Sequence, residues 1–236
     1  VDAGLNNKYG ADAMVSYRNH KYAAFVSMDY SHREFTGERN TERRITDLEG
    51  TTLTTIGSGD MIFSREPYSI RGGVDLFLTD NDVLSIGGTF GNRSHEREME
   101  MLYEEFNNVD KIKKEYLSVD ESERSGNYYR LSLDYQHKFN DEGHELLGQA
   151  NYSTRDGGEE SVNFLENMAD EITSGQKSTE TGPSVDYRFK MDYTLPISKT
   201  DKFEAGVQSR IDESTEDNEV FQYNTATGEY ELKEQY

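Results

Sequence analysis

The sequence predicts an all-β protein whose antiparallel strands follow one another in an up-and-down meander. Apolar and polar residues alternate along several stretches, as they do in strands with one apolar and one polar face. These stretches come in pairs joined by short turns. The 236 residues include 16 tyrosines and 11 phenylalanines but only 3 prolines, a composition that suits strands better than helices.

The clearest alternation lies in residues 128–139, YYRLSLDYQHKF. Aromatic rings stand at both ends of its apolar side, and its polar side carries charges of both signs. A strand that crosses a membrane within a barrel needs about 9–11 residues with an apolar, aromatic-bordered outside and a hydrated inside. The stretch therefore predicts a membrane-spanning strand with this apolar side: Tyr129, Leu131, Leu133, Tyr135 and Phe139.

Two earlier pairs of strands show the same design. The first pair covers residues 11–18 and 22–30, around a turn at Asn19-His20-Lys21. The second covers residues 68–78 and 84–90, where Phe77 breaks the pattern by falling on the polar side. Between the pairs, residues 33–65 are polar, and their threonine-rich part predicts an extension of the strands as a hairpin. Residues 95–124 are charged and predict a long loop.

The later part of the chain completes the meander. Residues 146–152 return from the 128–139 strand, and residues 185–195 and 203–207 form a fourth pair. Between them, the spacing of apolar residues in 159–176 favours a short amphipathic helix. The end of the chain predicts an exposed hairpin around residues 225–228. About eight spanning strands result, with short turns at one rim and long charged loops at the other.

Composition and charge restrict the function. With 46 acidic and 25 basic residues, the formal net charge is −21, which argues against a nucleic-acid partner. The mean hydropathy of −0.91 would be too polar for a helical membrane protein but not for a barrel. No apolar run approaches the roughly 20 residues of a transmembrane helix. The first residues show no signal peptide, so an exported protein would be shown here in mature form or as a fragment.

Four segments resemble a known family. Residues 173–197 (TSGQKSTETGPSVDYRFKMDYTLPI), 202–212 (KFEAGVQSRID), 10–31 and 223–232 resemble the outer-membrane β-barrel family among TonB-dependent receptors. The resemblance covers nearly the whole chain through diffuse strand patterns rather than an invariant motif. It implies a receptor in the outer membrane of a Gram-negative cell, with a barrel of about 22 strands that an N-terminal plug closes.

The same resemblance sets an expectation for domain organisation. No counterpart of the energy-coupling segment, the plug or the C-terminal closing strand is recognised, and about eight strands cannot form a wall of about 22. Residues 1–236 are therefore expected to be one partial barrel domain, an internal piece forming an open curved sheet or a partial barrel. The implied partners are outer-membrane lipid, the TonB protein acting through the missing regions, and a small-molecule, glycan or peptide cargo.

Candidate site residues come from the polar sides of the strands. The functional interpretation is that charges lining the lumen steer or bind cargo. The structural interpretation, which the sequence favours, is that opposite charges pair across strands and keep the wall hydrated. The predicted lumen-lining residues are Arg71, Asp75, Arg130, Asp134, Asp186, Arg188, Lys190 and Asp192.

No catalytic, cofactor or metal motif is recognised. The five histidines lack metal-binding spacing, and no nucleophile elbow, P-loop or dinucleotide fingerprint occurs. The acidic runs at 156–160 and 212–217 could offer oxygen ligands to calcium, but solvated loops are the favoured interpretation. We therefore expect a transport protein that is no enzyme and holds no cofactor. The alternatives are a passive porin-like channel, an outer-membrane enzyme and a soluble β-barrel binding protein.

Overall fold

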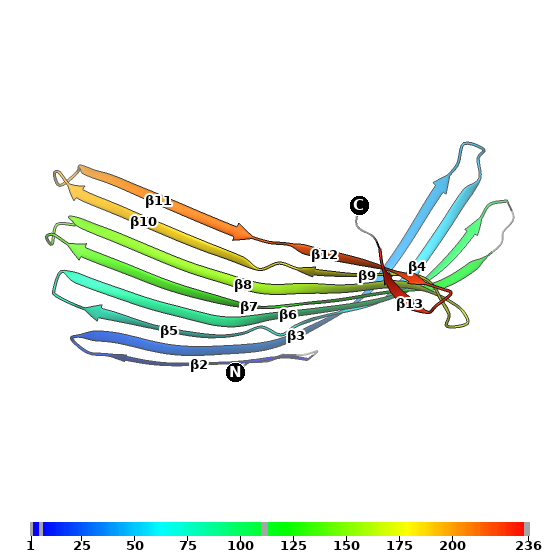
Figure 1. The fold of residues 1–236 in the computed structure, drawn as a ribbon, viewed down its shortest axis with the longest axis horizontal. Helices are drawn as coiled ribbons and strands as arrows, with labels where there is room; N and C mark the ends of the chain where they lie inside the picture. Colours follow the sequence, from blue (N-terminus) through cyan, green and yellow to red (C-terminus); the bar gives the residue numbers. More distant parts are fainter. Residues whose placement is uncertain (1, 5–6, 110–112, 234–236) are drawn as a thin grey trace.

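The computed structural model describes residues 2–4, 7–109 and 113–233 (Figure 1). These residues form thirteen strands in a single antiparallel sheet, and none of them lies in a helix. No helix in this part of the chain could therefore cross a membrane. The prediction of an all-β, antiparallel up-and-down fold is confirmed. The strands are β1 (Asp2–Gly4), β2 (Lys8–Arg18), β3 (Tyr22–Thr46), β4 (Thr52–Arg65), β5 (Tyr68–Phe77), β6 (Asp82–Asn107), β7 (Lys114–Lys138), β8 (Glu145–Asn167), β9 (Ile172–Thr181), β10 (Ser184–Pro196), β11 (Lys202–Ser214), β12 (Asp217–Asn224) and β13 (Glu229–Leu232).

Some of these strands continue one another end to end. β4 and β5 both lie between β3 and β6, and the register with β6 runs on unchanged from Arg65↔His95 to Tyr68↔Asn92. The ladder is interrupted at Pro67, which has no backbone N–H to donate. β9 and β10 likewise both pair with β8, on either side of Pro183. With β11 and β12 treated in the same way, the meander has about eight long paths, as predicted.

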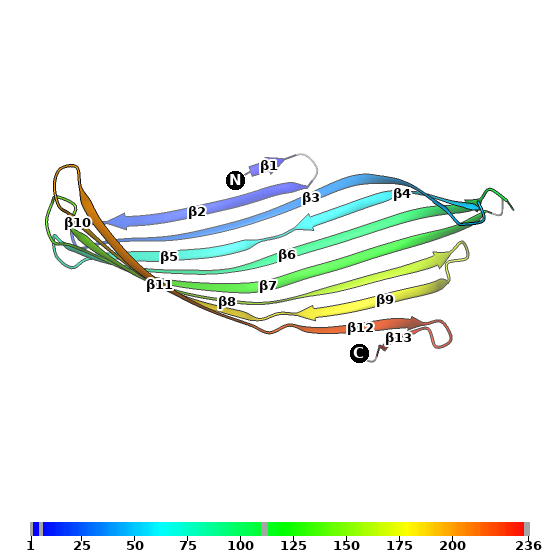
Figure 2. The same ribbon diagram turned by 90° about the horizontal axis from the view of Figure 1, so that it is seen from above.

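The sheet is curved and open (Figures 1 and 2). The N-terminal strands β1 and β2 form one edge, and β11, β12 and β13 form the other. No pairing between described residues joins these two edges. An open edge strand presents unpaired N–H and C=O groups, which a membrane protein must satisfy by closing the sheet into a cylinder. The open curved sheet is one of the two forms that the sequence predicted for a piece of a barrel.

Each side of the sheet has its own chemistry. Register places Leu133 beside Ile86 and Ala150, so the apolar residues of neighbouring strands share one side, the apolar face. Leu133 is 45% exposed and Leu131 58% exposed, whereas Met101 is the single described side chain that is almost fully enclosed. A single-layer sheet thus has almost no protein core. Its apolar face is therefore left without a covering layer of protein.

The apolar face covers only the half of the sheet next to the turns at residues 19–21, 78–81, 139–144 and 197–201, here called the proximal half. In the distal half, glutamates take over this side of the sheet. Glu96 lies opposite Glu123, which lies opposite Glu160, and Glu98 lies opposite Glu121. Because β6 has 26 residues, it is about 85 Å long, far more than a membrane crossing requires.

The prediction of long loops is wrong, because most of the residues concerned lie in strands. Residues 95–124 form the continuation of β6 and β7, which remain paired as far as Glu105↔Lys114. Residues 33–65 form the predicted hairpin, with β3 and β4 paired from Arg33↔Arg65 to Thr46↔Thr52. The connections at the distal end, 47–51, 108–113, 168–171 and 225–228, are short. The last of these is the predicted hairpin, now between β12 and β13.

The predicted helix over residues 159–176 is also wrong. β8 continues to Asn167 and pairs with β9, for example at Val162↔Lys177. A tight turn joins them, in which Asp170 adopts a positive φ of 61° and the Asn167 side chain accepts hydrogen bonds from the backbone of Ala169 and Glu171. Pairing on both sides of β8 outweighs the helix-like spacing of a few apolar residues, because the two ladders satisfy most of its backbone groups, with one irregularity between Leu165 and Glu166.

Aromatic rings on the polar face fill the space that glycines leave on the neighbouring strand. Phe25, Tyr128 and Tyr103 stand opposite glycines in the register, and a Cβ on those glycines would approach each ring to 2.8 Å or less. Such ring-over-glycine pairs cover backbone that a glycine alone would expose. Phe77, which broke the predicted alternation, lies on the polar face, and the Arg18 guanidinium stands 5.2 Å from its ring centre. The pairs, in the order ring and glycine, are Phe25 and Gly73, Tyr128 and Gly91, and Tyr103 and Gly57.

Candidate functional site

The predicted lumen-lining residues all lie on the polar face of the proximal half. Register brings Arg71, Arg130 and Asp186 into one row across the sheet, through Thr89 and Ser153. A second row holds Asp75, Asp134 and Lys190. Arg188 stands between these rows, opposite Asn151 and Arg210, and Asp192 lies closer to the short turns.

Most of these charges have polar partners on the same face. Arg71 bonds Asp29 at 2.8 Å, and Arg210 bonds Asp186 at 2.6 Å. Asp75 accepts a hydrogen bond from Ser85 at 2.6 Å, and Asp134 accepts one from Gln149 at 2.9 Å. Lys190 pairs with Asp192 at 2.5 Å. This pattern agrees with the interpretation in which opposite charges pair and hydrate the wall.

A second group of charges, which the sequence did not predict, lies just inside the distal half. Register places five basic side chains next to one another on the polar face across β2, β3, β4, β6 and β7. Each comes from a different strand, and all but Lys8 stand at the ends of segments 33–65 and 95–124, which the sequence did not predict to be membrane-spanning strands. Only the register of the sheet could reveal them as neighbours. We call this group the basic row: Lys8, Arg33, Arg65, His95 and Arg124.

Aromatic rings support the basic row. The Lys8 ammonium lies 4.2 Å from the ring centre of Phe35, and the Arg65 guanidinium lies 4.6 Å from that of Phe63. The rings of Phe63 and His95 stack at 6.2 Å. These cation–π contacts fix the positions of the cations without neutralising them. Within 4.0 Å of the row, the described carboxylates offer one partner, Glu159, at 3.8 Å from Arg124.

Burial and the neighbouring positive charges both lower the pKa of His95. Burial is the largest cause that lowers it below the ordinary value of 6.5, followed by the charges of Arg65, Arg124 and Arg93. The His95 Nδ1 atom is enclosed and has no hydrogen-bond partner among the described residues. The folded protein therefore holds this ring neutral at a pH where the same ring in the unfolded chain is half protonated.

This shift predicts how His95 titrates. Because the folded pKa is lowered, the unfolded chain takes up the proton first, and the stability due to neutral His95 is lost as the pH falls below about 6.5. An NMR titration of the His95 ring should give a midpoint below 6.5, and Arg65→Gln should raise that midpoint. Arg44→Gln removes the same charge near the tip of the β3–β4 hairpin and should leave it unchanged. A midpoint at or above 6.5 would contradict the expected crowding of cations.

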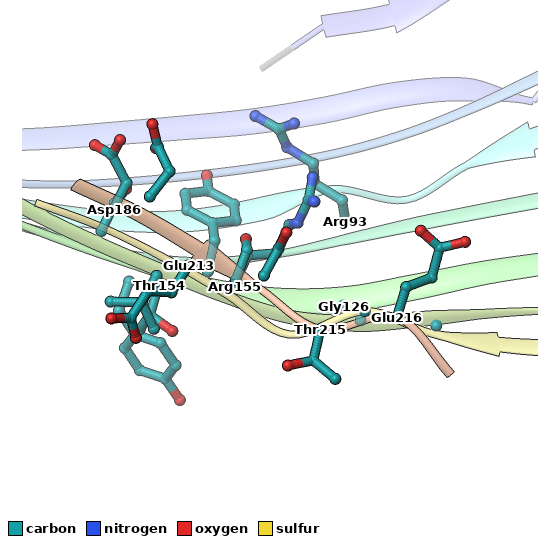
Figure 3. A pocket seen from close by; sticks show the side chains of 18 of the residues that line it. Arg93, Gly126, Thr154, Arg155, Asp186, Glu213, Thr215 and Glu216 are labelled. Atoms are coloured by element: carbon teal, nitrogen blue, oxygen red, sulfur yellow. The ribbon is translucent and has the colours of Figure 1, made fainter. Parts of the chain in front are cut away.

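A hollow of about 770 Å³ adjoins the end of the basic row formed by His95 and Arg124. Arg93, His95 and Arg124 line one part of it, and acidic residues such as Asp186 and Glu216 line another. Figure 3 shows Arg93, Asp186 and Glu216 pointing to the side of the sheet on which the N-terminal strands lie, while Thr215 points to the opposite side. The hollow thus opens mainly on the polar face, inside the curve of the sheet.

Histidines and aromatic rings mark the rim with the short turns. His137 Nδ1 lies 2.7 Å from Asp82, whose same carboxylate oxygen accepts a bond from the Tyr135 hydroxyl at 2.6 Å. His144 stacks on Phe139 with ring centres 4.2 Å apart. Amphipathic rings of this kind border the apolar zone of membrane barrels. Among the described residues, no group of three or more His, Cys, Asp or Glu is arranged to hold a metal ion.

One family of known proteins matches part of this sequence. The family model described as "Outer membrane protein beta-barrel family" matches residues 137–236, which include all of β8 to β13. No protein with a curated description matches the sequence.

Solved structures give only remote likenesses. Clostridium perfringens delta-toxin is 9% identical with a TM-score of 0.13, covering 93% of this chain and 100% of its own. The Pseudomonas putida toluene transporter TodX is 6% identical with a TM-score of 0.15, covering 88% and 81%. A protein described as a pore-forming protein is 11% identical with a TM-score of 0.11, covering 82% and 100%. The family match over residues 137–236 supports a location in the outer membrane, and the two-faced antiparallel sheet has the architecture of a β-barrel wall.

Proposed function

We propose that the chain forms part of the wall of a TonB-dependent outer-membrane receptor, which takes up a solute with energy supplied across the periplasm. The proposed role is transport, not catalysis. The resemblance of residues 173–197 and 202–212 to this class of receptors motivates the proposal. The outer-membrane barrel architecture is compatible with it.

One observation supports the proposal most strongly. The apolar face stays on the same side of all eight paths, yet the sheet ends in two unpaired edges. Unpaired edges cannot stay open within a membrane, so further strands would complete the cylinder. A wall that uses about eight strands without closing belongs to a large barrel, and the plugged barrels of about 22 strands are outer-membrane transporters.

The proposed partners follow from the two faces. Lipid would contact the apolar face, and cargo would contact the polar face and the distal ends of the strands. TonB would act through a plug and an energy-coupling segment outside these strands. The cargo would be a small molecule, a glycan or a peptide.

Cross-linking and conductance together test this function. In intact cells, cross-linking should link the protein to TonB, and the link should disappear when the TonB gene is deleted. In planar bilayers, the purified protein should show no steady conductance, because a plug closes the barrel. A steady open conductance without a link to TonB would instead indicate a passive channel.

A further inference from the structure

The positive charge of the basic row contrasts with the negative net charge of the chain. The protein carries a formal charge of −21, yet five basic side chains from five strands stand side by side on its polar face. In the proximal half, most charges on this face have polar partners, whereas in the basic row the described carboxylates offer a partner to Arg124 alone. We propose that the basic row, together with Arg93 beside it, binds a solute that carries several phosphate or carboxylate groups.

The spacing of the row sets the shape of this solute. Neighbouring strands lie about 4.8 Å apart, so five side chains on adjacent strands extend over about 19 Å. A single phosphate would reach two or three of them. A ligand with several anionic groups along its length can meet each cation in turn, and the charge-assisted bonds favour anionic oxygens over neutral ones.

The rings below the row hold the cations ready for the ligand. The Lys8 ammonium lies over the ring of Phe35, and the Arg65 guanidinium lies over the ring of Phe63. The Arg93 guanidinium lies 5.1 Å from the ring centre of Tyr128. A long basic side chain that is already positioned loses less conformational freedom when it binds an anion. The rings also offer flat apolar surface to the carbon skeleton of the solute.

The hollow beside the row provides room. Gly126 and Gly157 lie opposite each other on β7 and β8 and line this hollow, where they contribute no side chains. Farther along, the row continues into Glu159 and Glu180. These two carboxylates also line the hollow and repel an anion, so the ligand is confined to the basic row and to the part of the hollow that Arg93, His95 and Arg124 line. Figure 3 shows Arg93 extending over this region.

Binding of the anion and its role as cargo are separate claims. The binding site is defined by the row alone and needs no energy source. As a statement about cargo, the proposal rests on the import function proposed above. Binding measured on purified protein without TonB therefore tests the site, and cross-linking in cells tests the receptor.

Calorimetry with two probes tests the site. Inorganic tripolyphosphate and citrate are titrated at low ionic strength into the protein purified from outer membranes in an uncharged detergent. We expect saturable binding of at least one probe to a single site. Arg33→Gln and Arg65→Gln should each weaken it about tenfold, since each removes a charge-assisted hydrogen bond. Arg44→Gln makes the same change of charge outside the row and should leave the affinity unchanged.

Further outcomes decide against the proposal. It is overturned if neither probe binds, or if Arg44→Gln weakens binding as much as Arg65→Gln, because the effect would then reflect overall charge. If a variant does not show the gel mobility of the folded barrel, it is not folded, and a measurement on the unaltered protein takes its place as the test. There, tripolyphosphate should raise the NMR titration midpoint of His95 by offsetting the nearby guanidinium charges. An unchanged midpoint in the presence of the probe counts against the site.

Discussion

Replacing Leu133 by arginine is expected to destabilise the folded barrel by about 2–4 kcal/mol, the cost of a basic side chain at the centre of the lipid-facing zone. Leu133 lies in the middle of the apolar face, beside Ile86 and Ala150, with 45% of its surface exposed. Lipid offers an arginine at this depth neither water nor a carboxylate. The free energy of unfolding from lipid vesicles, obtained by guanidinium titration, measures the change.

Ser132→Arg is the matched control. Ser132 is the next residue at the same depth, but it lies on the polar face between Gly87 and Asn151. An arginine there reaches water, so its effect should be small, within roughly 0.5 kcal/mol. Equal losses for the two variants would mean that lipid does not lie against the Leu133 side. A greater loss for Ser132→Arg would mean that the faces are reversed.

Gly59→Ala is expected to destabilise the distal half by roughly 1–3 kcal/mol, the usual cost of overpacking. A Cβ on Gly59 would lie 1.9 Å from the carbonyl oxygen of Glu100 and 2.7 Å from the Cα of Met101. These are backbone atoms of the neighbouring strand and cannot turn aside as the end of a side chain can. β4 and β6 would therefore have to separate, next to Met101, which is completely enclosed. Hydrogen exchange of the β4 and β6 amides should become faster.

Gly148→Ala makes the same chemical change where there is space. Nothing lies within 4 Å of a Cβ at Gly148, which stands on the apolar face between Tyr135 and Met191. This variant should keep the stability and the exchange pattern of the unaltered protein. If Gly59→Ala were as harmless as Gly148→Ala, β4 and β6 would not approach as closely as the structure shows.

The proximal half was predictable because each of its strands has one uniformly apolar side. Leu131, Leu133 and Tyr135 recur at every second position, and polar residues fall between them. Strand pairs, short turns and the approximate number of strands followed from this alternation. Phe77 was the exception, and its contact with Arg18 needed the neighbouring strand to be known.

The distal half was not predictable in this way because water lies on both sides of it. Glu96, Glu98 and Glu100 alternate with residues that are also polar, so the hydrophobic period of two disappears although the strand continues. Residues 95–124 consequently resembled a loop. Residues 159–176 resembled a helix because Val162, Leu165 and Met168 happen to be three apart.

The lumen-lining residues could be predicted from the sequence, whereas the basic row could not. Lumen-facing residues such as Arg130 and Asp186 follow from the alternation within a single strand. The basic row depends on which residues stand opposite one another on five strands, and a shift of one residue would turn a side chain to the other face. Single-sequence patterns hold no information about that register between distant segments.

The glutamates on the outer side of the distal half have a consequence for the conditions in which this protein is studied. Glu96 stands opposite Glu123, and Glu98 opposite Glu121, on strands about 4.8 Å apart, so their mutual repulsion acts to push β6 and β7 apart. The Debye length is about 8 Å at physiological ionic strength and 30 Å in dilute buffer. Dilute buffers should therefore loosen the distal ends of these strands, while the proximal half, whose described residues include no such pairs of glutamates, stays unaffected.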